Sequence, residues 1–318
     1  EAFPDSSFLP SLLFNLAEWE VRYAKEQFNL EMEKYALLLS KCEKDTAGCS
    51  DLTDPVIDYS KALQVCRRLL TDHPRQPFID KVMYRTGICL YEIGKRDSAK
   101  TLFIRLSEQF PDSSYIPEIF FRIGECYFDE QEYEKSLNVY NKIIDSWDSP
   151  YFAMALYKRA WCYYQLNDYP QAVSTFFYLL NDIDLMEKMD TDLLGKSQVE
   201  LRDESLEYIA YCFTDMGGVD VALSFIKEIG GSDFTPRILQ KMAETYYKRD
   251  FFEEAIKVDR IILKSFPLFK YAPNVAFNMF ESYNKIGQID NAFEIRKTIS
   301  DNFNSRSKWA QINNEQED

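Results

Sequence analysis

The sequence predicts an all-α protein, a right-handed solenoid of about six to seven helix-turn-helix repeats with a long N-terminal helix. The first observation is a small residue, a large apolar residue three positions later, and a second small residue nine positions after that. This pattern occurs six times, beginning at Gly87, Gly124, Ala160, Ala210, Ala243 and, in a degraded copy, Phe280. The second observation is that successive copies begin 37, 36, 50, 33 and 37 residues apart. A unit with this period cannot close its own core and must stack on its neighbours.

One repeat can be followed along the chain from Met83 to Pro111. Apolar residues at helical spacing predict a first amphipathic helix, in which the small Gly87 lets another helix approach closely. Gly94 ends this helix, because glycine enters the left-handed conformation without steric cost. A second helix carries apolar residues between Ala99 and Leu106, and Pro111 prevents its continuation.

The remaining elements follow in order from the same pattern. They are a leading helix at 11–42, the second helix of the first repeat at 55–74, three regular repeats at 76–185, an insertion at 186–199, three further repeats at 200–304 and a polar tail at 305–318. The insertion accounts for the 50-residue spacing, which exceeds a 36-residue unit by 14. Insertions in repeat arrays often contact a partner, whereas a longer loop or an extended helix is the plainer explanation.

The repeat resembles the tetratricopeptide (TPR) repeat, because Gly or Ala, an aromatic residue, Ala and Pro recur at that family's offsets. Longer stretches are similar to TPR proteins of the bacterial cell envelope, namely the Tol-Pal-associated proteins and gliding-motility proteins of delta-proteobacteria. These stretches are Phe14–Tyr35, ALYKRAWCYYQLNDYPQAVSTF (Ala155–Phe176), ESLEYIAYCFTDMGG (Glu204–Gly218) and FNSRSKW (Phe303–Trp309). The resemblance covers about residues 12 to 310. It implies a helical, non-catalytic scaffold in the periplasm or at the outer membrane, as part of a larger Tol-Pal-like or motility-like complex.

The charge of the chain argues against nucleic acid as a partner. The 52 acidic residues outnumber the 37 basic ones, giving a net charge of −15, and no basic run exceeds two residues. A phosphate backbone requires clustered Lys and Arg, so a basic or mixed-charge protein is the expected partner. No stretch approaches the roughly 20 apolar residues of a membrane span, so direct membrane insertion is not expected. The chain begins at Glu1, which leaves a removed signal peptide or lipid anchor open.

Most of the seven cysteines are predicted to be buried core residues. Four of them lie two residues after the first small position of a repeat: Cys89, Cys126, Cys162 and Cys212. Equivalent residues of successive repeats lie too far apart for a disulfide, and Cys66 is a further core candidate. Cys42 and Cys49 flank a polar loop instead, where an oxidised pair is plausible in a periplasm. No C-x-x-C motif supports a structural zinc site.

Residues for catalysis or for cofactors are nearly absent from the sequence. His73 is the only histidine and lies beside a proline in a predicted turn, which excludes multi-histidine metal sites. The pair Asp182 and Asp184 has the spacing of ordinary solvated carboxylates, and the glycines form no phosphate-binding motif. We therefore predict a protein that is not an enzyme and that has no metal and no cofactor.

The predicted binding surface is the concave side of the array, which the first helix of each repeat lines. Positions three before and one, four and five after the small residue should face this groove. The candidate residues are Tyr84, Tyr91, Phe121, Glu125, Phe128, Asp129, Tyr157, Trp161, Tyr164, Glu207, Tyr211 and Tyr247. Exposed aromatic residues among carboxylates are typical of recognition surfaces, and we expect some of these rings to pack against neighbouring repeats instead.

This composition favours a partner segment with apolar anchors and Lys or Arg, through aromatic burial and cation–π contacts. Chaperone-adaptor TPR domains hold a terminal carboxylate with Lys and Asn, and a carboxylate would be repelled here. A cytoplasmic assembly adaptor or co-chaperone with the same fold is the alternative to the envelope scaffold. A helical-hairpin glycan hydrolase is a remote third, because it would need opposed carboxylates in a deep cleft.

Overall fold

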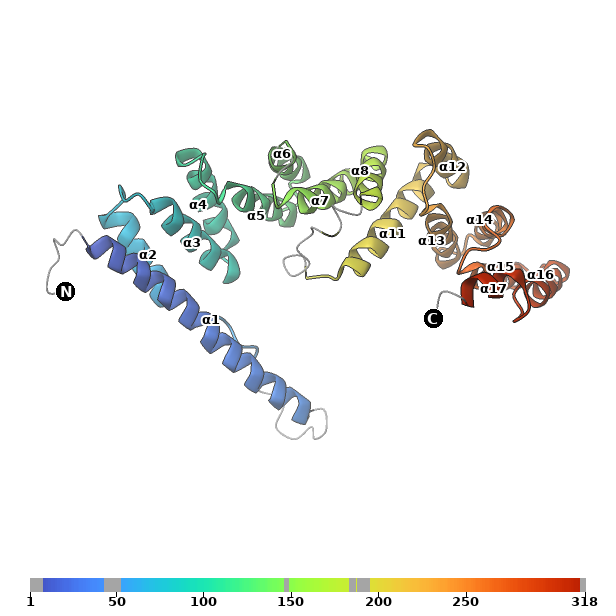
Figure 1. Ribbon diagram of the computed structural model, residues 1–318, viewed down its shortest axis with the longest axis horizontal. Helices are drawn as coiled ribbons and strands as arrows, with labels where there is room; N and C mark the ends of the chain where they lie inside the picture. Colours follow the sequence, from blue (N-terminus) through green and yellow to red (C-terminus); the bar gives the residue numbers. More distant parts are fainter. Residues whose placement is uncertain (1–7, 43–52, 146–148, 183–186, 188–194, 315–318) are drawn as a thin grey trace. The chain divides into compact units, whose positions relative to one another are not determined.

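The computed structural model describes residues 8–42, 53–145, 149–182, 187 and 195–314. All regular elements in these residues are helices, which confirms the predicted all-α fold (Figure 1). The chain forms two compact units, Glu1–Tyr151 and Phe152–Asp318. None of the described helices is by itself long and apolar enough to cross a membrane. The helices α11 (Gln198–Met216) and α12 (Val219–Glu228) pass the same test only as a pair, which is bent by 117°.

In its described residues unit 1 has a long helix followed by five shorter ones, and each helix packs on the next along the chain. They are α1 (Leu9–Cys42), α2 (Ser60–Asp72), α3 (Ile79–Glu92), α4 (Arg96–Gln109), α5 (Ile116–Asp129) and α6 (Tyr133–Ile144). The predicted helix at 55–74 thus begins later than expected, at Ser60. One half of α1 packs on α2 through Leu13, Ala17 and Val21, whereas the other half extends beyond α2 (Figure 1).

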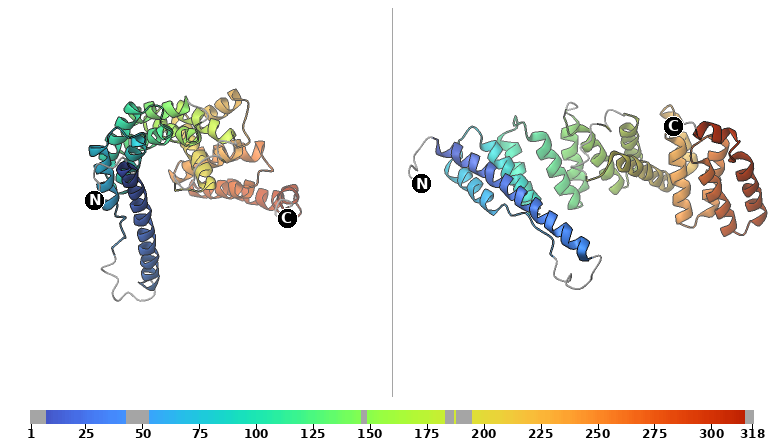
Figure 2. Two further views of the ribbon diagram at one scale, coloured as in Figure 1. Left: turned by 60° about the vertical axis from the view of Figure 1, so that its left-hand side comes forward. Right: turned by 60° about the horizontal axis from the view of Figure 1, so that its bottom comes forward.

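The described residues of unit 2 also form consecutive helices that pack on one another. Its helices are α7 (Phe152–Gln165), α8 (Tyr169–Asn181), α11 (Gln198–Met216), α12 (Val219–Glu228), α13 (Thr235–Lys248), α14 (Phe252–Ser265), α15 (Ala272–Lys285), α16 (Ile289–Asn302) and α17 (Lys308–Asn314). The orange-to-red helices of its last repeats stand side by side as hairpins in the right-hand view of Figure 2. A single apolar core runs from α7 to the start of α15.

The small residues of the pattern receive a large side chain from the second helix of the same repeat. A Cβ atom added to Gly87 would lie 2.2 Å from the ring of Phe103, and one added to Gly124 would lie 2.5 Å from the ring of Tyr140. Both rings are fully buried and both lie 16 positions after the glycine. The pattern is therefore a packing rule, in which a small residue on one helix makes room for a ring from its partner.

The turn inside each repeat has a left-handed residue at one fixed position. The residue seven positions after the first small one has a positive φ in all six copies: Gly94, Gln131, Asn167, Gly217, Asp250 and Gly287. Gly94 was predicted to end its helix and has φ 78°. Asn and Asp tolerate this region better than other non-glycine residues, and Gln131 adopts it at φ 62°.

Two regions differ from the predicted organisation. The segment 305–318, predicted as a polar tail, contains α17, because the Trp309 indole N–H donates to the Phe269 carbonyl oxygen at 2.8 Å and its ring contacts Phe303. Part of the insertion at 186–199 extends a helix: α11 has 19 residues, against 14 in α13, and Ser197 caps it with Glu200. Residues 183–186 and 188–194 lie outside the described part, and so does Asp184 of the acidic pair.

The cysteines of the repeat pattern are buried, as predicted. Cys89, Cys126, Cys162 and Cys212 are at most 1% exposed and are free thiols, and so is Cys66. Burial raises the pKa of Cys89 and of Cys212 to about 12 and that of Cys126 to about 11. Cys42 is disulfide-bonded, and Cys49 lies outside the described residues, so their predicted pairing stays a prediction.

We expect iodoacetamide at pH 8 to leave the four repeat-position thiols unlabelled in the native protein and to label them in denaturant. The reagent needs an accessible thiolate, and burial both covers these thiols and keeps them protonated. Mass spectrometry of digests made before and after denaturation measures the labelling at each site. Rapid labelling of all four in the native state would show that this helix face is not core.

Candidate partner-binding surface

Four aromatic side chains of unit 2 meet on one side of α7 and α11. Trp161 and Tyr164 lie one and four residues after Ala160, and Tyr208 and Tyr211 come from α11. The ring centroids of Trp161 and Tyr208 are 4.0 Å apart, those of Tyr164 and Tyr208 4.7 Å, and those of Tyr208 and Tyr211 5.4 Å. All four rings are half-buried. We call these four residues the aromatic cluster.

Three members of the aromatic cluster were predicted from the sequence, and Tyr208 was missed. Tyr208 lies two residues before the small Ala210, a position that the repeat pattern does not assign to the groove. It contacts Trp161, Tyr164 and Tyr211 and thus joins the rings of α7 to those of α11. The signal available in the sequence was its spacing of three from Tyr211, which places both rings on one helix face.

The prediction that Tyr157 faces the groove is wrong, because Tyr157 is only 3% exposed. Its ring packs edge-on against Phe176 and Trp161, and its hydroxyl donates to Glu204 Oε2 at 2.8 Å. Tyr157 therefore packs against the aromatic cluster through Trp161, and its hydrogen bond to Glu204 connects α7 to α11. Burial, followed by the nearby Glu204 carboxylate, raises the pKa of Tyr157 far above its usual value despite an opposing contribution from Trp161.

Carboxylates surround the aromatic cluster. Glu204 also accepts from the Lys196 ammonium group, and Glu207 accepts from the Tyr211 hydroxyl. Burial raises the pKa of Tyr164 and of Tyr211 to about 12, and the bond to Glu207 adds to the shift of Tyr211. Both tyrosines are therefore neutral hydrogen-bonding groups at physiological pH.

The edge of the aromatic cluster toward α13 carries one ion pair. Asp215 pairs with Arg249 across 3.1 Å, and the Arg249 guanidinium lies 5.9 Å from the Tyr211 ring. Tyr247, also a predicted groove residue, is half-buried and packs edge-on against Phe252 at 5.3 Å. The predicted Tyr247, with Arg249 just after the end of α13, thus adds one ring and one cation to this part of unit 2.

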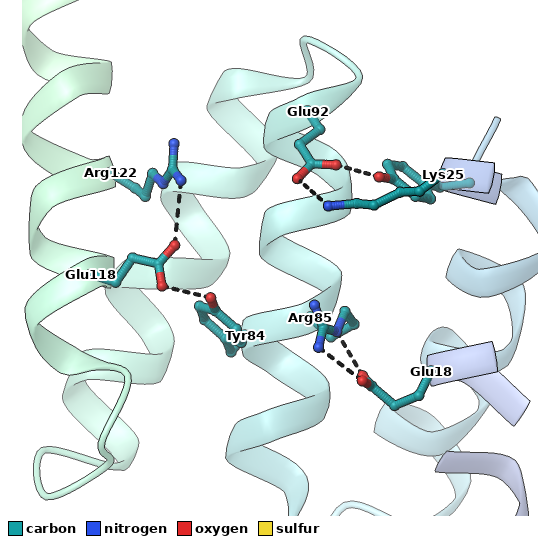
Figure 3. A network of polar contacts seen from close by, with 8 residues as sticks. Glu18, Lys25, Tyr84, Arg85, Glu92, Glu118 and Arg122 are labelled. Atoms are coloured by element: carbon teal, nitrogen blue, oxygen red, sulfur yellow. Dashed lines mark hydrogen bonds and ion pairs between the residues drawn. The ribbon is translucent and has the colours of Figure 1, made fainter. Parts of the chain in front are cut away.

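In unit 1 the predicted groove residue Tyr84 belongs to a network of polar contacts between neighbouring helices (Figure 3). The Tyr84 hydroxyl donates to Glu118 Oε2 at 2.6 Å, and the Tyr84 ring stacks on Tyr115 at 4.0 Å. Beside it, Arg85 donates to both oxygens of Glu18 at 2.6 and 2.8 Å. These side chains bind one another across α1, α3 and α5, so the network stabilises the stacking of the repeats.

Two cations lie over the ring of Tyr91. The Arg96 guanidinium lies 3.6 Å and the Arg122 guanidinium 4.9 Å from the centroid of its ring. Such contacts are worth about 0.5–2 kcal/mol. Because Arg96 and Arg122 already make cation–π contacts with this ring, Tyr91 has little free ring surface for a cation of a partner protein.

The other predicted residues of unit 1 divide into covered and exposed ones. The prediction that Phe121 faces the groove is wrong: it is 1% exposed and contacts the rings of Tyr140 and Tyr151. Glu125 accepts from the Tyr140 hydroxyl, and Phe128 packs edge-on against Tyr133 at 5.3 Å. Asp129 is exposed.

The described residues hold no group of three or more His, Cys, Asp or Glu side chains that could bind a metal ion. His73 follows the last residue of α2 and is half-buried. Three of the predicted groove residues, Trp161, Tyr164 and Tyr211, belong to the aromatic cluster, in which four half-buried rings contact one another.

Comparison with known proteins identifies the repeat. The tetratricopeptide repeat family matches residues 81–113, 118–148 and 154–176, which together span less than half of the chain. The chain matches no curated protein sequence.

Several solved structures resemble the chain at low sequence identity. A tetratricopeptide repeat protein from Parabacteroides merdae is 16% identical, and the match covers 92% of this chain and 100% of that one with a TM-score of 0.38. The apo form of RapI is 13% identical, covering 80% and 91% with a TM-score of 0.41. YrrB, described as a TPR protein with an unusual peptide-binding site, is 10% identical, covering 80% and 99% with a TM-score of 0.36.

Proposed function

We propose that this chain, which contains tetratricopeptide repeats in the three matched segments, is a non-catalytic scaffold that holds a segment of a partner protein on the aromatic cluster. The observation that supports this most is the contact of Trp161 with Tyr208 at 4.0 Å, since both rings remain half-buried after packing. Partly buried Trp and Tyr residues at the centre of a surface dominate binding energies in protein interfaces.

The chemistry of the aromatic cluster favours a basic segment with apolar anchors. The ring faces attract Lys and Arg, and Glu204, Glu207 and Asp215 add negative charge at the edges. The net charge of −15 supports the same partner at longer range. A terminal carboxylate would meet these acids, which disfavours the co-chaperone mode of binding.

We place this scaffold in the periplasm or at the outer membrane of a bacterium, in a Tol-Pal-like or motility-like complex. The support is the resemblance of residues 155–176, 204–218 and 303–309 to TPR proteins of the cell envelope. Fractionation of cells that express the full-length gene tests the compartment. Recovery in the cytoplasm would favour the assembly adaptor and leave the binding surface unaffected.

The binding proposal predicts that Trp161→Ala weakens binding of a selected peptide at least about thirtyfold. Truncating an aromatic hot spot costs about 2 kcal/mol or more, which corresponds to that factor. The probe is a peptide selected on the wild-type chain from a random library, titrated by calorimetry. We expect the selected peptides to be enriched in Lys or Arg beside apolar residues.

Tyr178→Ala is the matched control, because Tyr178 is a 53% exposed aromatic residue on α8 that is not in the aromatic cluster. It should bind like wild type. Glu207→Gln should mainly slow association and reduce its salt dependence. Circular dichroism distinguishes a loss of binding from a loss of folding. If Trp161→Ala unfolds the protein, Tyr211→Ala replaces it as the test variant. Wild-type affinity of folded Trp161→Ala would refute the proposal.

A further inference from the structure

The long helix α1 has two different sides. Leu13, Ala17 and Val21 are buried against the rest of unit 1. A second side, turned away from this buried face, carries six large apolar residues that are 41–63% exposed: Leu12, Leu16, Trp19, Tyr23, Leu30 and Leu37. We call these six residues the α1 stripe. The rings of Trp19 and Tyr23 stack on each other at 5.1 Å, so they form one exposed aromatic surface.

The spacing of the α1 stripe is that of a coiled coil. The intervals from Leu12 to Tyr23 are four, three and four residues, and Leu30 and Leu37 follow at intervals of seven. This is the alternation of the a and d positions of a heptad, which keeps one seam of a helix facing a partner helix over several turns. A helix that only covers its own repeat needs apolar residues on its buried side alone. The α1 stripe lies outside this buried side.

The exposed area is large enough to form an interface. An aromatic side chain carries roughly 150–250 Å² of surface, and about half of Trp19 is exposed together with 42–63% of each of the four leucines. The α1 stripe thus exposes several hundred Å², the upper end of what monomeric proteins tolerate. Two such faces buried together approach the roughly 1,200 Å² at which specific interfaces begin.

The charges on α1 determine which orientation of two such helices is favourable. Glu26 and Glu33 occupy the two heptad positions that interrupt the apolar sequence. Parallel helices in register would place each of these carboxylates against its own copy. Antiparallel helices with Leu12 opposite Leu37 place Trp19 opposite Leu30, Glu26 opposite Tyr23 and beside Arg22, and Glu33 opposite Leu16, so that no carboxylate faces a carboxylate.

We propose that the α1 stripe binds the α1 stripe of a second copy of this chain, as an antiparallel two-helix coiled coil. The heptad spacing, the exposed area and the charge arrangement each point to this occupant. The dimer would hold two aromatic clusters in one assembly. A bivalent partner would then bind more tightly than a single site allows.

The first test is the mass of the intact chain in solution, by sedimentation equilibrium over a hundredfold range of concentration. Wild type should be dimeric at the upper end of the range, and Leu30→Glu should be monomeric throughout. The matched control is Met32→Glu, since Met32 is 40% exposed, similar to Leu30 at 44%, but lies on another side of α1. It should dimerise like wild type.

The second test is the orientation, by disulfide cross-linking between two singly substituted proteins. Leu12→Cys mixed with Leu37→Cys should give a cross-linked dimer of the two proteins, whereas Leu12→Cys alone should not cross-link to itself. A monomeric wild type, or a dimer that survives Leu30→Glu, would overturn the proposal. Self-cross-linking of Leu12→Cys would overturn the antiparallel orientation.

Discussion

Replacing Asp259 with asparagine is expected to stabilise the protein at pH 8 by at least about 1.4 kcal/mol, the free energy that corresponds to a pKa raised by one unit. Asp259 is 1% exposed on α14, and neither carboxyl oxygen has a hydrogen-bond partner among the described residues. Burial, followed by the Glu244 carboxylate on α13, raises the pKa of Asp259 well above its usual value of 3.8. Folding therefore favours the protonated acid.

The sign of the pH dependence follows from this raised pKa. The protonated carboxyl contributes its full stabilisation below about pH 3.8, the unfolded value, and the contribution is lost as pH rises through the folded pKa. Asparagine does not titrate, so its advantage over wild type should grow between pH 5 and pH 8.

Urea unfolding of both proteins at the two pH values measures this advantage. Glu244→Gln is the control, because removing the neighbouring carboxylate should recover only a smaller part of the stability. An advantage of Asp259→Asn that is equal at both pH values would mean that Asp259 does not titrate in this range. The explanation would then be packing and not ionisation.

The second large effect is expected at Gly87. Alanine is preferred over glycine in helices by about 1 kcal/mol, yet we expect Gly87→Ala to destabilise the protein by about 1–3 kcal/mol, as overpacking of a core does. The new Cβ would lie 2.2, 2.8 and 2.9 Å from three ring atoms of Phe103. Phe103 is fully buried and cannot move aside without displacing its neighbours.

A double-mutant cycle with Phe103→Leu separates this clash from other effects. The leucine side chain vacates the space that the Cβ needs, so the double variant should be more stable than the sum of the two single changes predicts. Thermal unfolding followed by circular dichroism measures all four proteins. Strictly additive changes in the free energy of unfolding would show that the ring of Phe103 is not the reason why position 87 requires a small residue.

Asp259 also illustrates what the sequence does and does not predict. The repeat pattern predicts the helices, because its small and large residues describe contacts within a repeat that recur in each copy. Position 16 after the small residue holds the rings of Phe103, Tyr140 and Phe176 in three repeats. Asp259 occupies the same position in the fifth copy, and only the structure shows that it is buried without a partner.

The binding surface was predicted less completely than the fold. Trp161, Tyr164 and Tyr211 were predicted to lie on one face because helical spacing fixes the face, and the structure brings them together in the aromatic cluster. Whether a residue on that face is covered depends on the next helix, and Tyr157 is covered by Phe176 and Trp161. Tyr208 was missed because it lies two residues before Ala210, a position that the repeat pattern does not assign to the groove.

The ion pairs between α1 and α3 have a consequence for how this array could change in length. Arg85 pairs with Glu18 and Glu92 with Lys25, and Arg122 and Asp129 stand 37 residues later at the same positions of α5. A deletion of one 37-residue period would therefore put Arg122 and Asp129 in the places that Arg85 and Glu92 now occupy beside α1. Recombination within a gene can lose such a segment without leaving Glu18 or Lys25 unpaired. For this contact the first two complete repeats are interchangeable modules, and a shorter natural or engineered array can reuse α1 unchanged.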